Sequence, residues 1–413
     1  TRTMMLLRLC IVFSWTYTST SIHTAAAFLP SANNARSTGP CRPRPLFQAS
    51  KGHAKNSSSR RAASPPIQEG IRYIAGRRSI LVHPPPSSSN ESTKNPPLVI
   101  LGGMAQSIAS WEFHLPYLSR HRSVLIYEAL GQGPPPPSEV CSIDGREVTL
   151  ERYYDDVSLE RQGKDFWDVV EEAFFSPGSR YYKQNAPDND ITNAKVDVAS
   201  FSFGGRVSMA AALLKPKRIR RLHLTGVGAE RDGLANVILA SWNEILGSNS
   251  IDIDDVEMEE ECDPINHASK CTSRLRSFAW SVILATYSEQ FLASAGPERV
   301  KTWVDSVCRY NTEEGLRAIL MQTHDNGDEN LWTPAAMARQ IQSSQAIECH
   351  KIVVGSQDKM AHPTQALQLA KILQTGDMTE ESGTYKVMEG CGHAVPMEAM
   401  RLWREDVLGF LDK

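Results

Sequence analysis

Acidic side chains are absent from the first 68 residues, a stretch that contains nine lysines or arginines. This composition excludes an ordinary folded domain and is typical of a targeting leader. Long apolar runs are missing as well, because the mostly apolar stretch from Leu6 to Trp15 is interrupted by Arg8 and Ser14. It is far shorter than the ~20 residues that cross a bilayer. It therefore matches the apolar region of a signal peptide better than a membrane span.

Small residues end this apolar region, and a second basic stretch follows them. Thr24 to Ala27 precede Phe28, and residues 29–68 are rich in serine and arginine. This order resembles the two-part leader of plastid proteins in heterokont algae, in which a signal peptide ends before Phe and a transit peptide follows. The resemblance implies cleavage between Ala27 and Phe28, a largely disordered leader over 1–68, and a location in the stroma of a secondary plastid. An ordinary secretory or mitochondrial leader is the alternative.

The rest of the chain has no excess of basic residues and few cysteines. The full sequence has 44 basic and 47 acidic residues, so removal of the nine leader cations leaves 35 against 47, a net charge of −12. We therefore expect no basic surface for nucleic acid. The six cysteines after residue 68 are scattered without a Cys-x-x-Cys pair. Their spacing gives no sign of a zinc site or a disulfide framework and predicts free thiols.

One segment organises the remaining sequence. The apolar run Val196–Phe201 leads directly into Ser202, and an Ala- and Leu-rich stretch then continues to Leu214. This order predicts a strand, a tight turn and a helix. Such a turn leaves room only for small residues two positions before and after a nucleophile, and Ser200 and Gly204 occupy these positions. We therefore expect Ser202 to be a nucleophile; without partner residues, a structural serine in a glycine-rich turn is the alternative.

An acid and a histidine each follow a short apolar strand further along the chain. Asp358 comes after residues 351–355, and His393 comes after residues 385–388. His393 is expected to accept the proton of Ser202, and Asp358 to fix the imidazole tautomer and stabilise the imidazolium. Taken singly, Asp358 has an alternative as a turn or cap residue, and His393 has one as a loop residue.

A second histidine competes for the role of base. His362 lies closer in sequence to Asp358 than His393 does. It immediately precedes Pro363, however, at what has the pattern of a helix start. We therefore predict His393 as the base, and the chain order serine, aspartate, histidine matches the order found with a nucleophile elbow.

A glycine-containing loop follows an upstream strand pattern at Pro97–Leu101. With the elbow and its partners, this loop resembles the third strand and oxyanion loop of the α/β-hydrolase superfamily, where the loop commonly begins His-Gly. Gly102 stands at the His position here. The resemblance implies that the backbone N–H groups of Met104 and Phe203 form an oxyanion hole. The glycines of the loop and the elbow are Gly102, Gly103, Gly204 and Gly205.

The resemblance covers the chain from about Ile71 to Lys413 and implies a mostly parallel central sheet flanked by helices. Residues 69–233 and 345–413 are expected to form this core, and 234–344 an all-helical cap in which Leu275–Leu292 has the spacing of one helix. Glu128 and Leu130 depart from the family's Asp-x-Arg-Gly-x-Gly turn and leave the subfamily open. Four tryptophans of the predicted cap are candidates for an apolar acyl pocket, with cap core as the alternative: Trp242, Trp280, Trp303 and Trp332.

These features together predict a carboxylesterase-like serine hydrolase that cleaves an ester or related acyl bond of a hydrophobic small molecule, without metal or organic cofactor. A second hypothesis is a lyase, because Gly204-Gly205-Arg206 is similar to the succinyl-hydroxycyclohexadiene-carboxylate synthase of quinone biosynthesis, whose triad removes a proton. A third is a non-catalytic receptor on the same fold. Membrane association and oligomeric state stay open.

Overall fold

The computed structural model describes residues 70–84, 95–134, 142–143, 146–147, 153–185, 194–247, 271–322, 331–374 and 384–413. All of them belong to Ala63–Lys413, one of the two compact units of the chain. The predicted leader, 1–68, lies outside the described residues. Across these described ranges, no helix has both the length and the apolar composition needed to cross a bilayer.

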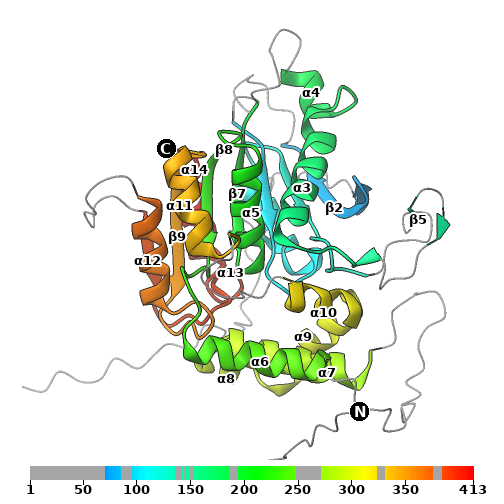
Figure 1. The fold of residues 1–413 in the computed structure, drawn as a ribbon, viewed down its shortest axis with the longest axis vertical. Coiled ribbons are helices and arrows are strands. Elements are labelled where there is room, and N and C mark those ends of the chain that lie inside the picture. The colour runs from blue at the N-terminus through cyan, green and yellow to red at the C-terminus, as the bar shows by residue number, and fades with distance from the viewer. Residues whose placement is uncertain are drawn as a thin grey trace, which may run out of the picture. The chain divides into compact units, whose positions relative to one another are not determined.

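The described residues build one mixed sheet of eight strands in the order β1-β2-β4-β3-β7-β8-β9-β10 (Figure 1). β2 runs antiparallel to β1 and to β4, and the other neighbouring strands are parallel. Several central strands are apolar and buried along their whole length, as expected for parallel strands with both faces covered. The predicted mostly parallel α/β architecture is confirmed. The strands are β1 (Arg72–Ile74), β2 (Arg77–Val82), β3 (Leu98–Leu101), β4 (Val124–Tyr127), β7 (Val196–Phe201), β8 (Ile219–Thr225), β9 (Ile347–Gly355) and β10 (Tyr385–Met388), beside a separate hairpin of β5 (Ser142–Ile143) and β6 (Arg146–Glu147).

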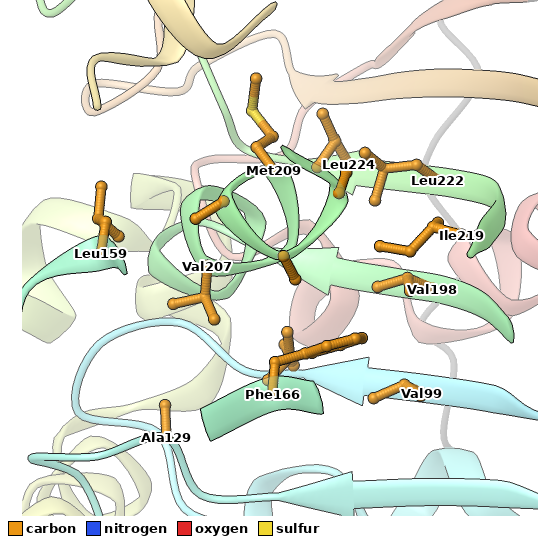
Figure 2. Close-up of a cluster of buried hydrophobic side chains, with 14 of the residues drawn as sticks. Val99, Ala129, Leu159, Phe166, Val198, Val207, Met209, Ile219, Leu222 and Leu224 are labelled. Atoms are coloured by element: carbon orange, nitrogen blue, oxygen red, sulfur yellow. The ribbon is translucent and has the colours of Figure 1, made fainter. Parts of the chain in front are cut away.

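A group of helices packs on one face of the sheet, with α5 near its centre (Figure 1). The small residues of α5 allow close approach by its neighbours, and Trp167 Nε1 donates a hydrogen bond to the carbonyl of Ala211 at 2.8 Å. Figure 2 shows part of the resulting core, in which Val198, Val207 and Phe166 are fully buried. The helices are α3 (Leu159–Val170), which continues as a π-turn (Glu171–Phe175) and α4 (Arg180–Asn185), then α5 (Phe203–Leu214), α11 (Pro334–Ser344) and α12 (Pro363–Leu373).

Two tryptophans anchor the core on the opposite face. The rings of Trp111 and Trp403 meet edge to face with centroids 5.6 Å apart, and both are buried. Trp403 Nε1 donates to Thr225 Oγ1 at 2.9 Å, which ties the last helix to the end of β8. This face is covered by η2 (Ile108–Ser110), η3 (Glu112–His114), α1 (Leu115–Leu118), α13 (Val395–Glu398) and α14 (Met400–Leu411).

A group of cap helices lies beyond one end of the sheet and has its own apolar core (Figure 1). The sequence predicted one helix over Leu275–Leu292, whereas the structure has two. Tyr287 has an extended backbone, and Ser288 begins the next helix by accepting a hydrogen bond from Phe291 N–H. The predicted cap range also includes residues 334–344, but this segment, α11, packs against α5 and α12. The cap helices are α6 (Gly233–Gly247), α7 (Ser273–Thr286), α8 (Glu289–Ala295), α9 (Pro297–Tyr310) and α10 (Glu313–Gln322).

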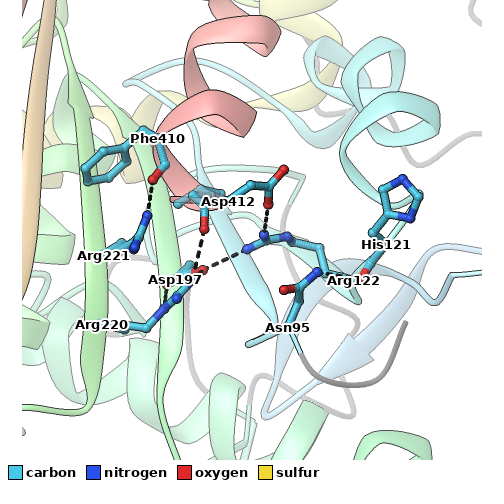
Figure 3. Close-up of polar contacts among 9 residues, drawn as sticks. Asn95, His121, Arg122, Asp197, Arg220, Arg221, Phe410 and Asp412 are labelled. Atoms are coloured by element: carbon cyan, nitrogen blue, oxygen red, sulfur yellow. Dashed lines mark hydrogen bonds and ion pairs between the residues drawn. The ribbon is translucent and has the colours of Figure 1, made fainter. Parts of the chain in front are cut away.

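A buried ion cluster holds the other end of the sheet (Figure 3). The Asp197 side chain on β7 has no exposed surface, and Arg122 Nη1 donates to it at 2.7 Å. Arg220 on β8 donates through Nε at 2.9 Å, and Arg122 also reaches Asp412 near the C-terminus. Because a buried carboxylate is costly without partners, this cluster fixes two strands and the chain end relative to each other.

A second buried carboxylate, Asp406 on α14, makes stability depend on pH. It accepts hydrogen bonds from Lys351 Nζ at 2.9 Å, Lys386 Nζ at 2.8 Å and His223 Nε2 at 3.1 Å. Burial raises the pKa of Asp406, but the hydrogen bonds from these three partners outweigh it and hold the pKa well below its usual value.

We expect this depressed pKa to produce acid sensitivity. The ionised Asp406 carboxylate contributes fully to stability above about pH 4, the pKa of the carboxyl group in the unfolded chain. This contribution is lost as the pH falls to the pKa of Asp406 in the folded protein. Asp406→Asn is therefore expected to lower the urea midpoint at pH 7, and the gap from wild type is expected to narrow below about pH 4. A difference in urea midpoint between wild type and Asp406→Asn that stays constant with pH would contradict the depressed pKa of Asp406.

Candidate active site

Ser202 lies at the sharp turn between β7 and α5. Its φ of 52° and ψ of −116° are sparsely populated by residues with a Cβ atom. Its N–H donates to the carbonyl of Thr225 at 2.8 Å, so the strained turn is held by the neighbouring strand. Two positions earlier, Ser200 is fully buried and its Oγ lies 2.9 Å from Ser208 Oγ. A serine is therefore accommodated where this kind of elbow usually has glycine.

The glycines around the turn occupy positions where no side chain fits. A Cβ atom on Gly204 would lie 2.6 Å from the carbonyl oxygen of Gly102, and one on Gly103 would lie 2.6 Å from the ring of Phe201. A Cβ atom on Gly205 would lie 2.4 Å from a valine side chain. Because a Cβ atom does not approach other heavy atoms so closely in folded proteins, these positions need glycine, and at Gly204 the elbow packs directly on the backbone of the predicted oxyanion loop.

Gly204→Ala is expected to destabilise the protein by about 1–3 kcal/mol, as overpacked sites do. The added Cβ atom meets main-chain atoms of Leu101 and Gly102, so the loop beside Ser202 must move and activity is expected to fall as well. Urea denaturation and ester turnover check both effects. Gly409→Ala is the matched control, because a Cβ atom there meets nothing within 4 Å. Equal stability and equal ester turnover of Gly204→Ala and Gly409→Ala would contradict the prediction.

The structure brings the three predicted catalytic residues together. Ser202 Oγ lies 2.8 Å from His393 Nε2, and His393 Nδ1 lies 2.9 Å and 2.8 Å from the two carboxylate oxygens of Asp358. Asp358 also accepts hydrogen bonds from the N–H groups of Met360 at 2.8 Å and Ala361 at 2.7 Å. The carboxylate is thus held as an acceptor for Nδ1–H, which leaves Nε2 free to accept the serine proton.

Two adjacent parallel strands deliver the acid and the histidine to the same place. A Cβ atom on Gly355, at the end of β9, would lie 2.0 Å from the carbonyl oxygen of Gly392. The N–H of Gln357 donates to the carbonyl of Cys391 at 2.8 Å. The loop that contains Asp358 is therefore bonded directly to the loop that contains His393.

His362, the competing histidine, caps a helix. Its side chain accepts a hydrogen bond from Thr364 N–H at the start of α12, and its Nδ1 lies 2.8 Å from Thr364 Oγ1. It is exposed, whereas His393 is buried between Ser202 and Asp358. The geometry therefore favours His393 as the partner of the serine.

The two predicted oxyanion donors, Met104 and Phe203, line the same cavity as Ser202. Phe203 is the first residue of α5, where an N–H group has no partner within the helix. In the part of the chain that the structure describes, neither Phe203 N–H nor Met104 N–H donates to a protein group. The loop before Met104 is fixed by Gly103 N–H, which donates to Gln106 Oε1 at 2.8 Å. Met104 and Phe203 both line the cavity that contains Ser202.

A cavity of about 550 Å³ lies between the core and the cap and reaches Ser202 and His393. Its cap side is mostly apolar, and Tyr287, Phe291 and Trp303 stack there with ring centroids 5.2–5.8 Å apart. Of the four tryptophans named as pocket candidates, Trp242 and Trp303 line the cavity. The other two pack elsewhere: Trp280 against the cap core and Trp332 against the core on the α5 face of the sheet.

Two glutamates support the site in ways that the sequence did not reveal. Glu128 is buried and accepts hydrogen bonds from Arg78 Nη1 at 2.7 Å and from Ile108 N–H at 3.0 Å, which holds η2 behind the oxyanion loop. Burial raises the pKa of Glu128 despite the charge of Arg78. Glu398 ends α13 and accepts a hydrogen bond from the His393 loop. Ser288, which also donates to Glu398, lies 110 positions away in the sequence, so no local spacing could identify that contact.

Within the described residues, no three His, Cys, Asp or Glu side chains cluster as ligands for a metal ion.

A mostly parallel sheet, a serine on a sharp strand-to-helix turn and a helical cap over the strand ends define an α/β hydrolase. The sequence matches the model of the alpha/beta hydrolase family over residues 98–404, and the chain belongs to that family. No curated protein sequence matches it.

Solved structures share the fold at low sequence identity. An enol-lactonase from Burkholderia xenovorans LB400 is 14% identical with a TM-score of 0.54, over 83% of this chain and 100% of that chain. A meta-cleavage product hydrolase from Pseudomonas fluorescens IP01 is 14% identical with a TM-score of 0.51, over 84% and 98%. A thermophilic esterase from Thermogutta terrifontis is 13% identical with a TM-score of 0.50, over 84% and 98%. At these identities the likeness supports the fold alone.

Proposed function

We propose that this α/β hydrolase is a serine hydrolase of the carboxylesterase type, which cleaves an ester or related acyl bond through an acyl-enzyme. The observation that supports this most directly is the continuous contact from Ser202 Oγ through His393 to Asp358 at the wall of a cavity. A hydroxyl is too weak an acid to attack a carbonyl unaided, and a histidine held by a carboxylate removes that barrier.

The reaction follows from the positions of these groups. Ser202 Oγ attacks the carbonyl carbon while His393 Nε2 takes its proton, and the N–H groups of Met104 and Phe203 donate to the oxyanion. Collapse of the tetrahedral intermediate expels the alcohol, which receives the proton from His393. A water molecule activated by His393 then attacks the acyl-enzyme and releases the acid. Asp358 stabilises the imidazolium in both halves of the reaction.

The substrate is proposed to be a hydrophobic small molecule. The cavity has room for one, since typical ligand sites measure roughly 300–1,000 Å³, and its cap side presents Leu239, Trp242, Val282, Phe291 and Trp303. Esters of medium acyl length are expected to be turned over faster than acetate esters or charged esters. Turnover confined to very small or charged esters would exclude this substrate class.

A fluorophosphonate probe tests the mechanism before any substrate is known. It labels a serine that is activated by a neighbouring base, so wild type is expected to be labelled, and Ser202→Ala and His393→Ala to remain unlabelled. Failure to label well-folded wild type would instead favour the lyase or the non-catalytic receptor. Circular dichroism of each variant shows whether the fold is retained.

A second candidate function, the lyase, is favoured by the position of Arg206. This residue lies in the first turn of α5, is buried, and lines the cavity beside Ser202. In the synthase that the Gly204-Gly205-Arg206 sequence resembles, the triad removes a proton and pyruvate leaves. Incubation with the substrate of that synthase separates the two functions, because only the lyase releases pyruvate from it.

The basic, acid-free residues 1–68 are proposed to direct the protein to the stroma of a secondary plastid. Fusion of this segment to a fluorescent protein in a heterokont alga tests the proposal. Plastid fluorescence that is lost when Phe28 is replaced by Ala supports it, whereas secretion or mitochondrial fluorescence would overturn it.

A further inference from the structure

The carboxylate of Glu398 joins the loop before His393 to the junction between cap helices α7 and α8. Glu398 Oε1 accepts a hydrogen bond from Gly392 N–H at 2.9 Å. The same oxygen accepts one from Ser288 N–H at 3.2 Å, and Oε2 accepts one from Ser288 Oγ at 2.5 Å. A single side chain therefore fixes the residue before His393 and the residue that begins α8.

The main chain makes close contact at the same place. Ala394 N–H, on the other side of His393, donates to the carbonyl of Thr286 at 2.9 Å. A Cβ atom on Gly392 would lie 2.6 Å from Ser288 N and 2.8 Å from the Thr286 oxygen. His393 is thus flanked on both sides by residues that bond directly to the cap junction.

The junction between α7 and α8 also forms part of the cavity wall. Tyr287 lies between the two bonded residues, and its ring stacks on Phe291 of α8 and Trp303 of α9. All three rings line the cavity. A displacement of the cap at this junction would therefore move the main chain beside His393 together with the side chains that line the cavity.

Glu398 has no cation to compensate its charge among the described residues. Its carboxylate accepts hydrogen bonds from two backbone N–H groups and one hydroxyl. Burial raises its pKa, and the nearby charge of Asp358 adds to that effect. A half-buried carboxylate without a cation costs stability, and such groups concentrate at functional sites.

We propose that Glu398 is a positioning residue, which holds His393 in register with Ser202 by bonding its loop to the α7–α8 junction of the cap. The inference rests on the proposed role of His393 as the base. Since a displacement of about 1 Å at a reacting group can cost roughly 100-fold in rate, loss of these bonds is expected to act on the chemical step.

Glu398→Ala in the full-length protein is the first test. It is expected to lower kcat for a medium-chain ester by about 10- to 100-fold, with KM changed by less than about threefold. Glu398→Gln keeps one oxygen that can accept from Gly392 N–H, so it is expected to recover most of kcat. Glu405→Ala is the matched control, because Glu405 lies on the exposed face of α14 and pairs with Arg401. An unchanged kcat in Glu398→Ala, or equal losses in the Ala and Gln variants, would overturn the proposal.

Amide hydrogen exchange tests the contact without any turnover. Exchange in the segment 389–394 is expected to speed up in Glu398→Ala and to stay as in wild type in Glu405→Ala; unchanged exchange in both would overturn the proposal. The proposed function fails separately, if wild type and Ser202→Ala react equally with the fluorophosphonate probe.

Discussion

Ser202→Ala is expected to lower kcat/KM for a medium-chain p-nitrophenyl ester by at least about 10⁴-fold. The Oγ atom of Ser202 lies 2.8 Å from His393 Nε2, and in the proposed mechanism it is the atom that forms the acyl-enzyme. Because the three residues act as a unit, His393→Ala is expected to lose a similar factor, and the double variant little more than either single one. Steady-state kinetics with active-site titration measure these losses.

His362→Ala serves as the matched control for the histidine. It removes an exposed imidazole that caps α12, so its kcat/KM is expected to stay within about twofold of wild type. Substantial activity in Ser202→Ala, or equal losses in the two histidine variants, would contradict the assignment of the nucleophile and base.

Asp197→Asn is expected to lower the free energy of unfolding by about 3–5 kcal/mol. The substitution removes the charge that faces Arg122 and Arg220, and the Arg122 side chain has only 1% of its surface exposed. Asp412 remains beside Arg122 but is itself half exposed, so it compensates the buried cation incompletely. The loss comes mainly from a guanidinium left in a poorly solvated site.

Urea denaturation of full-length protein measures this loss. Glu160→Gln is the matched control, because it breaks the exposed pair with Lys164 on α3, and such pairs contribute at most about 1 kcal/mol. A loss no larger for Asp197→Asn than for the control would show that the cluster is not a main source of stability. Ester turnover at low temperature should persist in the folded fraction, since the cluster lies at the opposite end of β7 from Ser202.

The fold was predictable because its signals are local. Most of the parallel strands contain short apolar runs, and the turn at Ser202 has small residues on both sides, so the pattern and composition of the sequence indicate the strands and the turn. The positions after β9 and β10 also follow from local pattern: a strand that ends in a parallel sheet delivers the next residues to the same edge. This is why Asp358 and His393 could be named from the sequence as partners of Ser202.

The cap was less predictable than the core, because the helical spacing of apolar residues continues without interruption from α7 into α8, although the helix itself is broken between them. Residues 275–292 have continuous helical spacing, yet Tyr287 is extended and Ser288 starts a new helix. Ser288 followed by Glu289 is a helix-start signal that competes with the apolar pattern. The contact of Ser288 with Glu398 spans 110 positions, and no local pattern reports contacts of that range.

The distance along the chain between the serine and its base has a consequence for biosynthesis. Ser202 and His393 lie 191 positions apart, and β9 and β10 must both join the sheet before the base reaches the hydroxyl. Contacts of such long range form late, after loop closure has been compensated by other strand pairs. In a nascent chain that has already formed its elbow, Ser202 therefore lacks His393 as a neighbour until β9 and β10 have left the ribosome and joined the sheet.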